Sequence, residues 1–256
     1  MMILRAMLVL LLGLTGVLGA PTSAQQAIDA NLITAIDVSG SIKEPDERLE
    51  LEGMAAAVVD PRFLQAIARG RHGRIGFVAF TWANGEFFFL VPWTSIASKA
   101  DADQVAERLR TARGKPMNGY SMRIRSNQRP WRTGHATDVS AAIDRAIRVG
   151  AEAPLASHHQ VINMCANGID NIGDGPDAAR DRADAAGVIV NDLVLGHRAD
   201  AGEIAAWYHD HVQAGPGSFV IEARDFEDIT SALLAKFLFE LAAVPPAPPG
   251  ASEAPT

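Results

Sequence analysis

Short apolar runs alternate with segments of helical periodicity along most of the chain. Runs typical of buried strands occupy residues 31–37, 74–82, 86–93, 159–166, 188–196 and 218–223. Between and after them, apolar residues recur at helical spacing over residues 44–60, 101–113, 135–150, 177–187, 201–210 and 226–244. Strands that alternate with helices favour a mostly parallel sheet with helices on both faces. The pattern therefore predicts an α/β fold of the doubly wound, Rossmann-like type.

The second and third predicted strands are separated only by residues 83–85, Ala-Asn-Gly. An Asn-Gly turn between two apolar runs favours an antiparallel hairpin, so we expect one antiparallel edge strand. In open sheets of this type, ligands bind beyond the carboxyl ends of the strands, where the strand order reverses. If the first strand is central, the residues that follow it lie at that position.

The two ends of the chain differ from the rest. Arg5 precedes an apolar run over residues 7–20, and the small residues Thr22 and Ala24 follow it. This order is typical of a signal peptide, which we place at residues 1–24, and it predicts a periplasmic or secreted protein. The run is short for a membrane span, so we expect no stable membrane insertion after cleavage; an uncleaved anchor is the alternative. Residues 25–243 form the predicted domain, and the Pro- and Ala-rich residues 244–256 a disordered tail.

Composition narrows the functional classes. The chain has 256 residues, 48% hydrophobic residues and a net charge of −7, as ordinary globular proteins do. Without a basic face, nucleic-acid binding is not expected. The lone cysteine, Cys165, excludes an internal disulfide, and its apolar surroundings predict a buried thiol.

The segment Asp-Val-Ser-Gly-Ser follows the first predicted strand and carries Asp37, Ser39 and Ser41. These residues offer one carboxylate and two hydroxyls, which are the oxygen donors that a hard cation such as Mg²⁺ prefers. The alternate spacing lets a loop bring all three side chains together. A plain polar turn would use the same residue types, so the motif alone leaves both interpretations open.

This motif, at the start of an alternating α/β chain, resembles the metal-ion-dependent adhesion site of von Willebrand factor A domains. The resemblance extends over residues 30–242, and segments such as VPWT (91–94) and AAGVIVNDLVLG (185–196) suggest an exported bacterial branch of unknown function. It implies that Asp37, Ser39, Ser41 and Thr137 hold Mg²⁺, Mn²⁺ or Ca²⁺. It also implies a protein partner whose acidic side chain completes the metal shell, and no catalytic step.

One position departs from the family pattern. Where relatives carry an aspartate after the fourth strand, this chain has Asn167. An asparagine can still accept a hydrogen bond but brings no charge, so we expect weaker cation binding at a degenerate site. Asp138 and Asp170 are near in sequence and are candidates to compensate. A metal-independent interaction scaffold is therefore one alternative, and a periplasmic metal-dependent hydrolase is another.

Other polar segments are weaker candidates. A long basic loop over residues 114–134 is a possible partner contact through Arg123, Arg125, Arg129 and Trp131. Gly173 and Gly175 match part of a dinucleotide motif but follow the preceding strand too late for that role. The pair His209 and His211 lacks further ligands at metal spacing, and we expect surface histidines.

Overall fold

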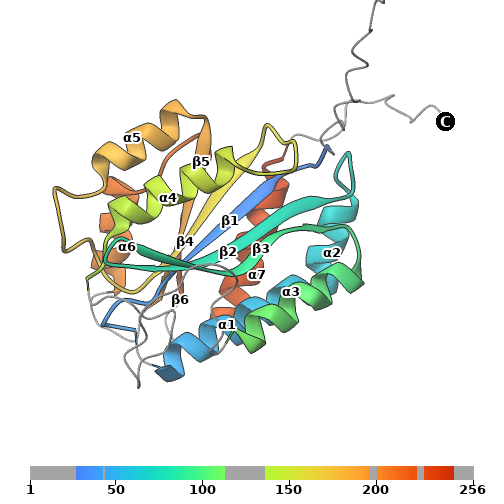
Figure 1. Ribbon diagram of the computed structural model, residues 1–256, viewed down its shortest axis with the longest axis horizontal. Helices are drawn as coiled ribbons and strands as arrows, with labels where there is room; N and C mark the ends of the chain where they lie inside the picture. Colours follow the sequence, from blue (N-terminus) through green and yellow to red (C-terminus); the bar gives the residue numbers. More distant parts are fainter. Residues whose placement is uncertain (1–26, 43, 113–135, 196–200, 224–227, 245–256) are drawn as a thin grey trace, which may run out of the picture.

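The computed structural model describes residues 27–42, 44–112, 136–195, 201–223 and 228–244, which form a six-stranded sheet with helices on both faces (Figure 1). The strand order is β3-β2-β1-β4-β5-β6. Neighbouring strands are parallel except for β2 and β3, which pair antiparallel. The doubly wound fold with one antiparallel edge strand is thereby confirmed. The strands are β1 (Asn31–Asp37), β2 (Ile75–Ala83), β3 (Glu86–Ile96), β4 (Gln160–Ala166), β5 (Val188–Leu195) and β6 (Val220–Ala223).

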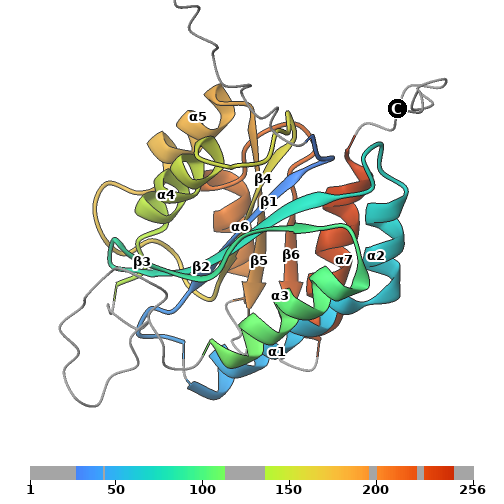
Figure 2. The ribbon, with the colours of Figure 1, turned by 45° about the vertical axis from the view of Figure 1, so that its right-hand side comes forward.

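Helices cover the two faces of the sheet unequally (Figures 1 and 2). One face packs against α1 (Glu44–Val59), α2 (Pro61–Ala68), α3 (Lys99–Thr111) and α7 (Ile229–Ala242). The other packs against α4 (Val139–Ala151), α5 (Asp177–Ala185) and α6 (Ala201–His211). The apolar pattern did not predict α2, a helix of eight residues that begins shortly after α1 ends. Its start is encoded locally, because Asp60 caps it by accepting a hydrogen bond from the Arg62 amide and Pro61 follows the cap.

The first strand lies at the centre of the sheet because both of its faces are apolar. All seven residues of β1 are buried. Leu32 and Ile36 pack into the core under α1 and α7, whereas Ile33 and Ala35 pack into the core under α4. A strand buried on both faces needs a continuous apolar run rather than an alternating one, which is what the sequence shows.

The hairpin between β2 and β3 ends close to the segment that precedes α4. Asn84 (φ 50°) and Gly85 (φ 72°) both adopt positive φ angles, as the predicted Asn-Gly turn requires. The Asn84 amide donates to the Ala136 carbonyl oxygen at 3.0 Å. The hairpin tip thus supports the loop that carries Thr137.

The strand order reverses between β1 and β4, so the chain leaves these neighbours toward opposite edges of the sheet. Their carboxyl ends, at Asp37 and Ala166, lie side by side at this switch point. Such a position leaves a crevice between the diverging loops, where ligands of doubly wound sheets bind. Cys165, one residue before the end of β4, is buried as predicted.

Several predictions fall outside the described residues. They concern the signal peptide at residues 1–24, the tail beyond Val244, and the basic loop with Arg123, Arg125, Arg129 and Trp131. In the part of the chain that the structure describes, no helix has both the length and the apolar character that crossing a membrane requires.

Candidate metal site

The loop after β1 turns back on itself through its own aspartate. The Ser39 amide donates to Asp37 Oδ1 at 2.7 Å, which is the turn that an aspartate forms with the backbone two residues on. Asp37 and Ser39 are fully buried, and Ser41 is partly exposed. The turn brings Ser39 Oγ and Ser41 Oγ to 3.2 Å from each other. The predicted convergence of these three side chains is therefore present.

A second loop adds a hydroxyl from a distant part of the chain. Thr137 Oγ1 donates to Ser39 Oγ at 3.1 Å, and Thr137 is only 3% exposed. Its backbone is fixed by Asn171, because the Thr137 amide donates to Asn171 Oδ1 at 2.9 Å and the Asn171 amide donates to the Thr137 carbonyl at 3.0 Å. Thr137 therefore lies two residues before the start of α4 with a fixed orientation.

Asn167 completes the arrangement from the third loop. It follows β4 directly, and its Oδ1 accepts a hydrogen bond from Ser41 Oγ at 2.6 Å. Side-chain hydrogen bonds thus connect Thr137, Ser39, Ser41 and Asn167 in a row, with Asp37 held beside Ser39. The structure brings together all five residues that the sequence singled out for this site.

The spacing of these oxygens suits a small hard cation. Neighbouring oxygens around an octahedral Mg²⁺, with bonds of 2.0–2.1 Å, lie about 3.0 Å apart. The hydroxyl pairs that Ser39 forms with Ser41 and Thr137 are separated by 3.2 and 3.1 Å. No three His, Cys, Asp or Glu side chains gather at metal-binding spacing among the described residues. A cation here would therefore be held mainly by neutral oxygens, with Asp37 as the charged donor.

The two acidic residues considered as replacements for the missing aspartate contact the start of α4. Asp138 caps this helix, because its Oδ1 accepts from the Ala141 amide at 2.9 Å. Asp170 Oδ1 accepts from the Ile172 amide at 3.4 Å. Burial raises the pKa of the Asp170 carboxyl, and the charge of Asp138 raises it further. Asp138 thus shapes the loop around Thr137. Because Asn167 is neutral, the five site residues carry one negative charge fewer than they would with an aspartate at position 167.

Two carboxyl groups that the sequence analysis did not consider lie behind the site. Glu47 and Glu50 on α1 are each 1% exposed. Burial raises the pKa of Glu50 well above its usual range, and the negative charges of Asp37 and Glu47 add to this effect. Their spacing of three residues on the face of α1 that carries Leu51 and Met54 was the sequence signal that they point inward.

A tyrosine from α6 fixes the backbone next to Asn167. The Tyr208 hydroxyl donates to the Gly168 carbonyl oxygen at 3.0 Å, and the side chain is 1% exposed. Burial raises the pKa of Tyr208 well above its usual value, with a further contribution from the charge of Asp37, so the hydroxyl keeps its proton and stays a donor. Nothing in the local sequence indicated this contact, because α6 follows the third loop only after β5.

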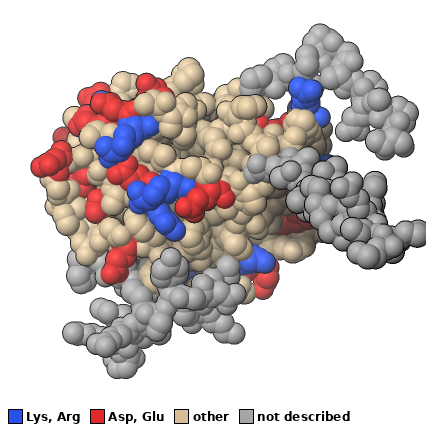
Figure 3. Space-filling model, turned by 45° about the horizontal axis from the view of Figure 1, so that its top comes forward, with Lys and Arg blue, Asp and Glu red and all other residues tan. Residues whose placement is uncertain are grey.

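The remaining polar candidates lie on the surface. In the last turn of α6, His209 is exposed and contacts Asp210 at 2.9 Å, and His211 is half-buried and contacts Asp177 at 3.1 Å. On the face seen in Figure 3, described basic and acidic side chains are interspersed. Ion pairs on the surface of the domain include Arg182–Asp144 at 2.8 Å. Among the described residues, the face in Figure 3 has no extended basic patch.

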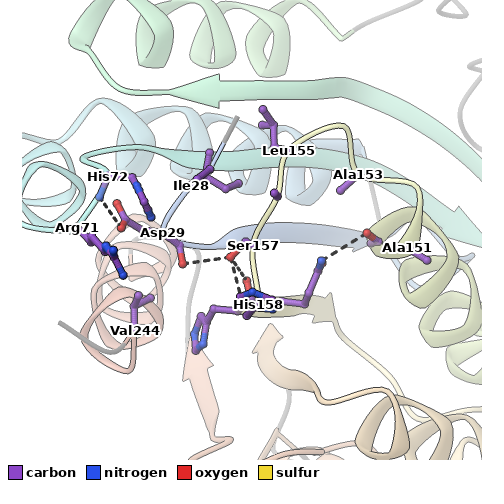
Figure 4. A pocket seen from close by; sticks show the side chains of 15 residues that line it. Ile28, Asp29, Arg71, His72, Ala151, Ala153, Leu155, Ser157, His158 and Val244 are labelled. Atoms are coloured by element: carbon purple, nitrogen blue, oxygen red, sulfur yellow. Dashed lines mark hydrogen bonds between the residues drawn. The ribbon is translucent and has the colours of Figure 1, made fainter. Parts of the chain in front are cut away.

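A hollow lies at the opposite end of the sheet. A cavity of about 750 Å³ opens at the amino ends of β1 and β4, and Asp29, His72, Ser157 and His158 are among its lining residues (Figure 4). Asp29 Oδ1 accepts from the His72 amide at 2.8 Å, and Ser157 Oγ donates to the Asp29 carbonyl oxygen at 3.2 Å. These polar groups tie loops together rather than converge on one point, so we assign the candidate site to the carboxyl end.

Comparison with known proteins supports the same fold. The family model described as "Protein of unknown function (DUF1194)" matches residues 27–245. A search of curated proteins found no match. Proximal thread matrix protein 1 of the mussel byssus, with a zinc-occupied MIDAS motif, aligns over 85% of this chain at 18% identity and a TM-score of 0.54. The pilus adhesin SpaC of Lactobacillus rhamnosus GG aligns over 86% at 10% identity and a TM-score of 0.55.

The chain spans about half of the mussel protein (49%) and a third of the adhesin (32%). At these identities the likeness shows the fold, which is that of von Willebrand factor A domains and fits the sheet order and the three converging loops described above. The family match, by contrast, covers more than half of the sequence. The chain belongs to the DUF1194 family of proteins of unknown function, and its domain has a von Willebrand factor A-like fold.

Proposed function

We propose that this protein is an exported module that binds a protein partner through a divalent cation. Asp37, Ser39, Ser41 and Thr137 would hold the cation, and Asn167 would act as a neutral acceptor beside them. The observation that carries the proposal is the row of hydrogen-bonded oxygens from three separate loops at the switch point of the sheet. A turn that served only to end β1 would not need hydrogen-bonding side chains from two other loops.

Charge decides which partner such a site favours. A divalent cation brings two positive charges, and among the five site residues only Asp37 carries a carboxylate. The bound cation would therefore leave a local excess of positive charge that attracts a carboxylate of a partner. Because the site lies where loops diverge at the end of a sheet, a partner can reach it without unfolding the domain.

The comparisons support this proposal by analogy. One structural neighbour is described with a zinc-occupied MIDAS motif, and another is a pilus adhesin. Both descriptions concern those proteins and not this chain. The periplasmic or secreted location rests on the apolar segment at residues 7–20, whose features are those of an export signal. Mg²⁺ is the cation that we favour, since the donors are all hard oxygens, with Mn²⁺ and Ca²⁺ as alternatives.

The test is a calorimetric titration of Mg²⁺ and Mn²⁺ into the chain and into Ser39→Ala, with Ser95→Ala on β3 as the matched control. We expect saturable binding in the wild type and in Ser95→Ala, and none in Ser39→Ala, because Ser39 contacts both other hydroxyls. Absence of binding in the wild type would overturn the metal-dependent function and favour the metal-independent scaffold. Turnover of a hydrolysable substrate that requires the metal would instead favour the hydrolase.

A further inference from the structure

Two exposed isoleucines lie in the loop that begins at Asn167. In the part of the chain that the structure describes, four large apolar side chains are exposed, namely Leu49, Ile169, Ile172 and Phe239. Two of the four, Ile169 (46% exposed) and Ile172 (43% exposed), lie within five residues of Asn167. An apolar side chain at a protein surface is ordinary by itself, but a pair beside a candidate binding site indicates a contact surface.

The loop that carries these isoleucines is fixed at several points. The Gly168 carbonyl accepts from the Tyr208 hydroxyl, and Asn171 is joined to the Thr137 backbone in both directions. A Cβ atom placed on Gly168 would lie 3.8 Å from Thr137 Oγ1, so Ile169 begins directly beside the row of hydroxyls. Each isoleucine is adjacent in sequence to Asp170 or Asn171, whose contacts hold the backbone. The apolar surface is therefore preorganised and loses little entropy on binding.

The acidic residues of the same rim restrict what can bind there. Asp138 follows Thr137 and Asp170 follows Ile169 in the sequence, so both carboxyl groups belong to the loops that form the site. A partner with several neighbouring carboxylates would bring further negative charge toward these two residues. A partner with one carboxylate and apolar neighbours would avoid this repulsion and would cover the isoleucines. Covering apolar side chains is favourable, so partial cover of these two isoleucines can change affinity about tenfold.

We propose that the partner is a protein segment in which a single Glu or Asp is flanked by aliphatic or aromatic side chains. The carboxylate would be drawn to the cation site, and a flanking apolar side chain would pack on Ile169 and Ile172. This inference rests on the proposed function and narrows it, because a metal site alone sets no preference for the residues next to the carboxylate. Recognition would then combine one ionic contact with an apolar contact on a fixed loop.

The test uses four synthetic peptides of equal length and the full-length chain in saturating Mn²⁺. Three peptides have a central Glu flanked on both sides by Leu, by Ser or by Glu, and the fourth has a central Gln flanked by Leu. Fluorescence anisotropy gives their dissociation constants for the wild type, the double variant Ile169→Ser/Ile172→Ser, and the control Phe239→Ser. Phe239 is 60% exposed on α7, so Phe239→Ser removes an exposed apolar side chain away from the three loops.

We expect the Leu-flanked Glu peptide to bind the wild type about tenfold more tightly than the Ser-flanked peptide does. The Glu-flanked peptide should bind no more tightly than the Ser-flanked peptide. The double variant should lose this preference but keep the affinity for the Ser-flanked peptide and for Mn²⁺. Phe239→Ser should keep the preference. The Gln peptide should bind at least tenfold more weakly than its Glu counterpart, and chelation of the metal should abolish binding of all carboxylate peptides.

Equal affinity for Leu- and Ser-flanked peptides would overturn the inference and leave the metal-dependent function standing, provided that calorimetry shows metal binding. The inference is equally overturned if the double variant keeps the preference, or if no peptide binds a metal-loaded chain. Loss of metal binding in the double variant would show a damaged fold. In that case Ile169→Leu/Ile172→Leu is the deciding variant: it should retain the preference for the Leu-flanked peptide, and loss of this preference in a variant that binds metal would overturn the inference. A wild type that binds no metal overturns both proposals together.

Discussion

The two ends of the sheet differ in how their polar side chains are used. The amino end has a hollow of about 750 Å³, and several ionisable residues line it. There Asp29 and Ser157 make their hydrogen bonds to backbone groups of neighbouring loops. At the carboxyl end, side-chain oxygens of Ser39, Ser41 and Asn167 make hydrogen bonds to one another. Polar side chains thus contact one another at the carboxyl end, whereas at the amino end they join loops, and this difference is why we take the carboxyl end as the candidate site.

The largest effect is expected from removing one hydroxyl at each end. Thr137→Val keeps the shape of the side chain but removes the oxygen that contacts Ser39, so metal affinity should fall about 100-fold or more, beyond the ~10–100-fold typical of residues that only support a ligand. Ser157→Ala should leave metal affinity unchanged and lower the free energy of unfolding by about 1 kcal/mol. Titration calorimetry measures the metal affinity, and chemical unfolding measures the free energy of unfolding. Equal loss of affinity in both variants would break the comparison.

A smaller effect is expected from adding one charge at each end. Asn167→Asp places a carboxylate beside Ser41 and should tighten metal binding about tenfold, since unit charges about 4 Å apart interact by roughly 1–4 kcal/mol near a protein surface. Gln160→Glu adds the same charge at the amino end and should change metal affinity little. Titration calorimetry with Mg²⁺ measures both. Unchanged affinity in Asn167→Asp would show that Asn167 lies outside the reach of the cation.

The hydrogen bond between Tyr208 and Gly168, behind the site, should affect metal affinity less than the site residues do. Tyr208→Phe removes the hydrogen bond to the Gly168 carbonyl, worth about 1 kcal/mol, and metal affinity should fall about threefold to fivefold. The neighbouring Trp207→Phe serves as the control and should leave affinity unchanged. The decisive measurement is metal affinity in variants with matched thermal stability. A drop in melting temperature with unchanged affinity would assign Tyr208 a structural role only.

The smallest effect on metal binding is expected from the interior between the two ends. Asp192 on β5 is fully buried, and burial raises the pKa of its carboxyl well above the usual value, against the opposing charge of Lys236. The folded state therefore holds this proton to higher pH than the unfolded state does, so stability should fall as the pH rises above about 4, the unfolded pKa. Asp192→Asn should make that fall shallower. Melting temperatures between pH 4 and 8 test this, with the exposed Asp210→Asn as a control that should keep the wild-type slope.

Much of the fold could be predicted because its signals are local. The apolar run of β1 and the Asn-Gly turn at Asn84 each determine one element without help from the rest of the chain. The helix α2 was missed because its eight residues follow α1 so closely that the two resemble one helix and a loop. Short helices of this kind depend on packing, here of Phe63 and Ile67, and not on a long periodic pattern.

The residues of the candidate site could be proposed from the sequence, but the contacts that hold their loops in place could not. The spacing of Asp37, Ser39 and Ser41 is local, and the resemblance to a known motif added Thr137 and Asn167. The contacts of Tyr208 with Gly168 and of Asn171 with Thr137 could not be predicted, because they depend on how distant loops meet at the end of the sheet. Likewise, only the packed position of α1 shows that Glu50 lies near Asp37.

The contact between Thr137 and Ser39 joins residues 98 positions apart, and that between Ser41 and Asn167 joins residues 126 apart. Such contacts form only after β1, β4 and the start of α4 have assembled, so an unfolded chain offers no equivalent set of oxygens. A ligand of this site would therefore bind the folded state alone and stabilise it by mass action, by about 2.7 kcal/mol at a concentration of 100 times its dissociation constant. The cation content of the compartment in which the chain folds would then help to determine how much of the protein is folded.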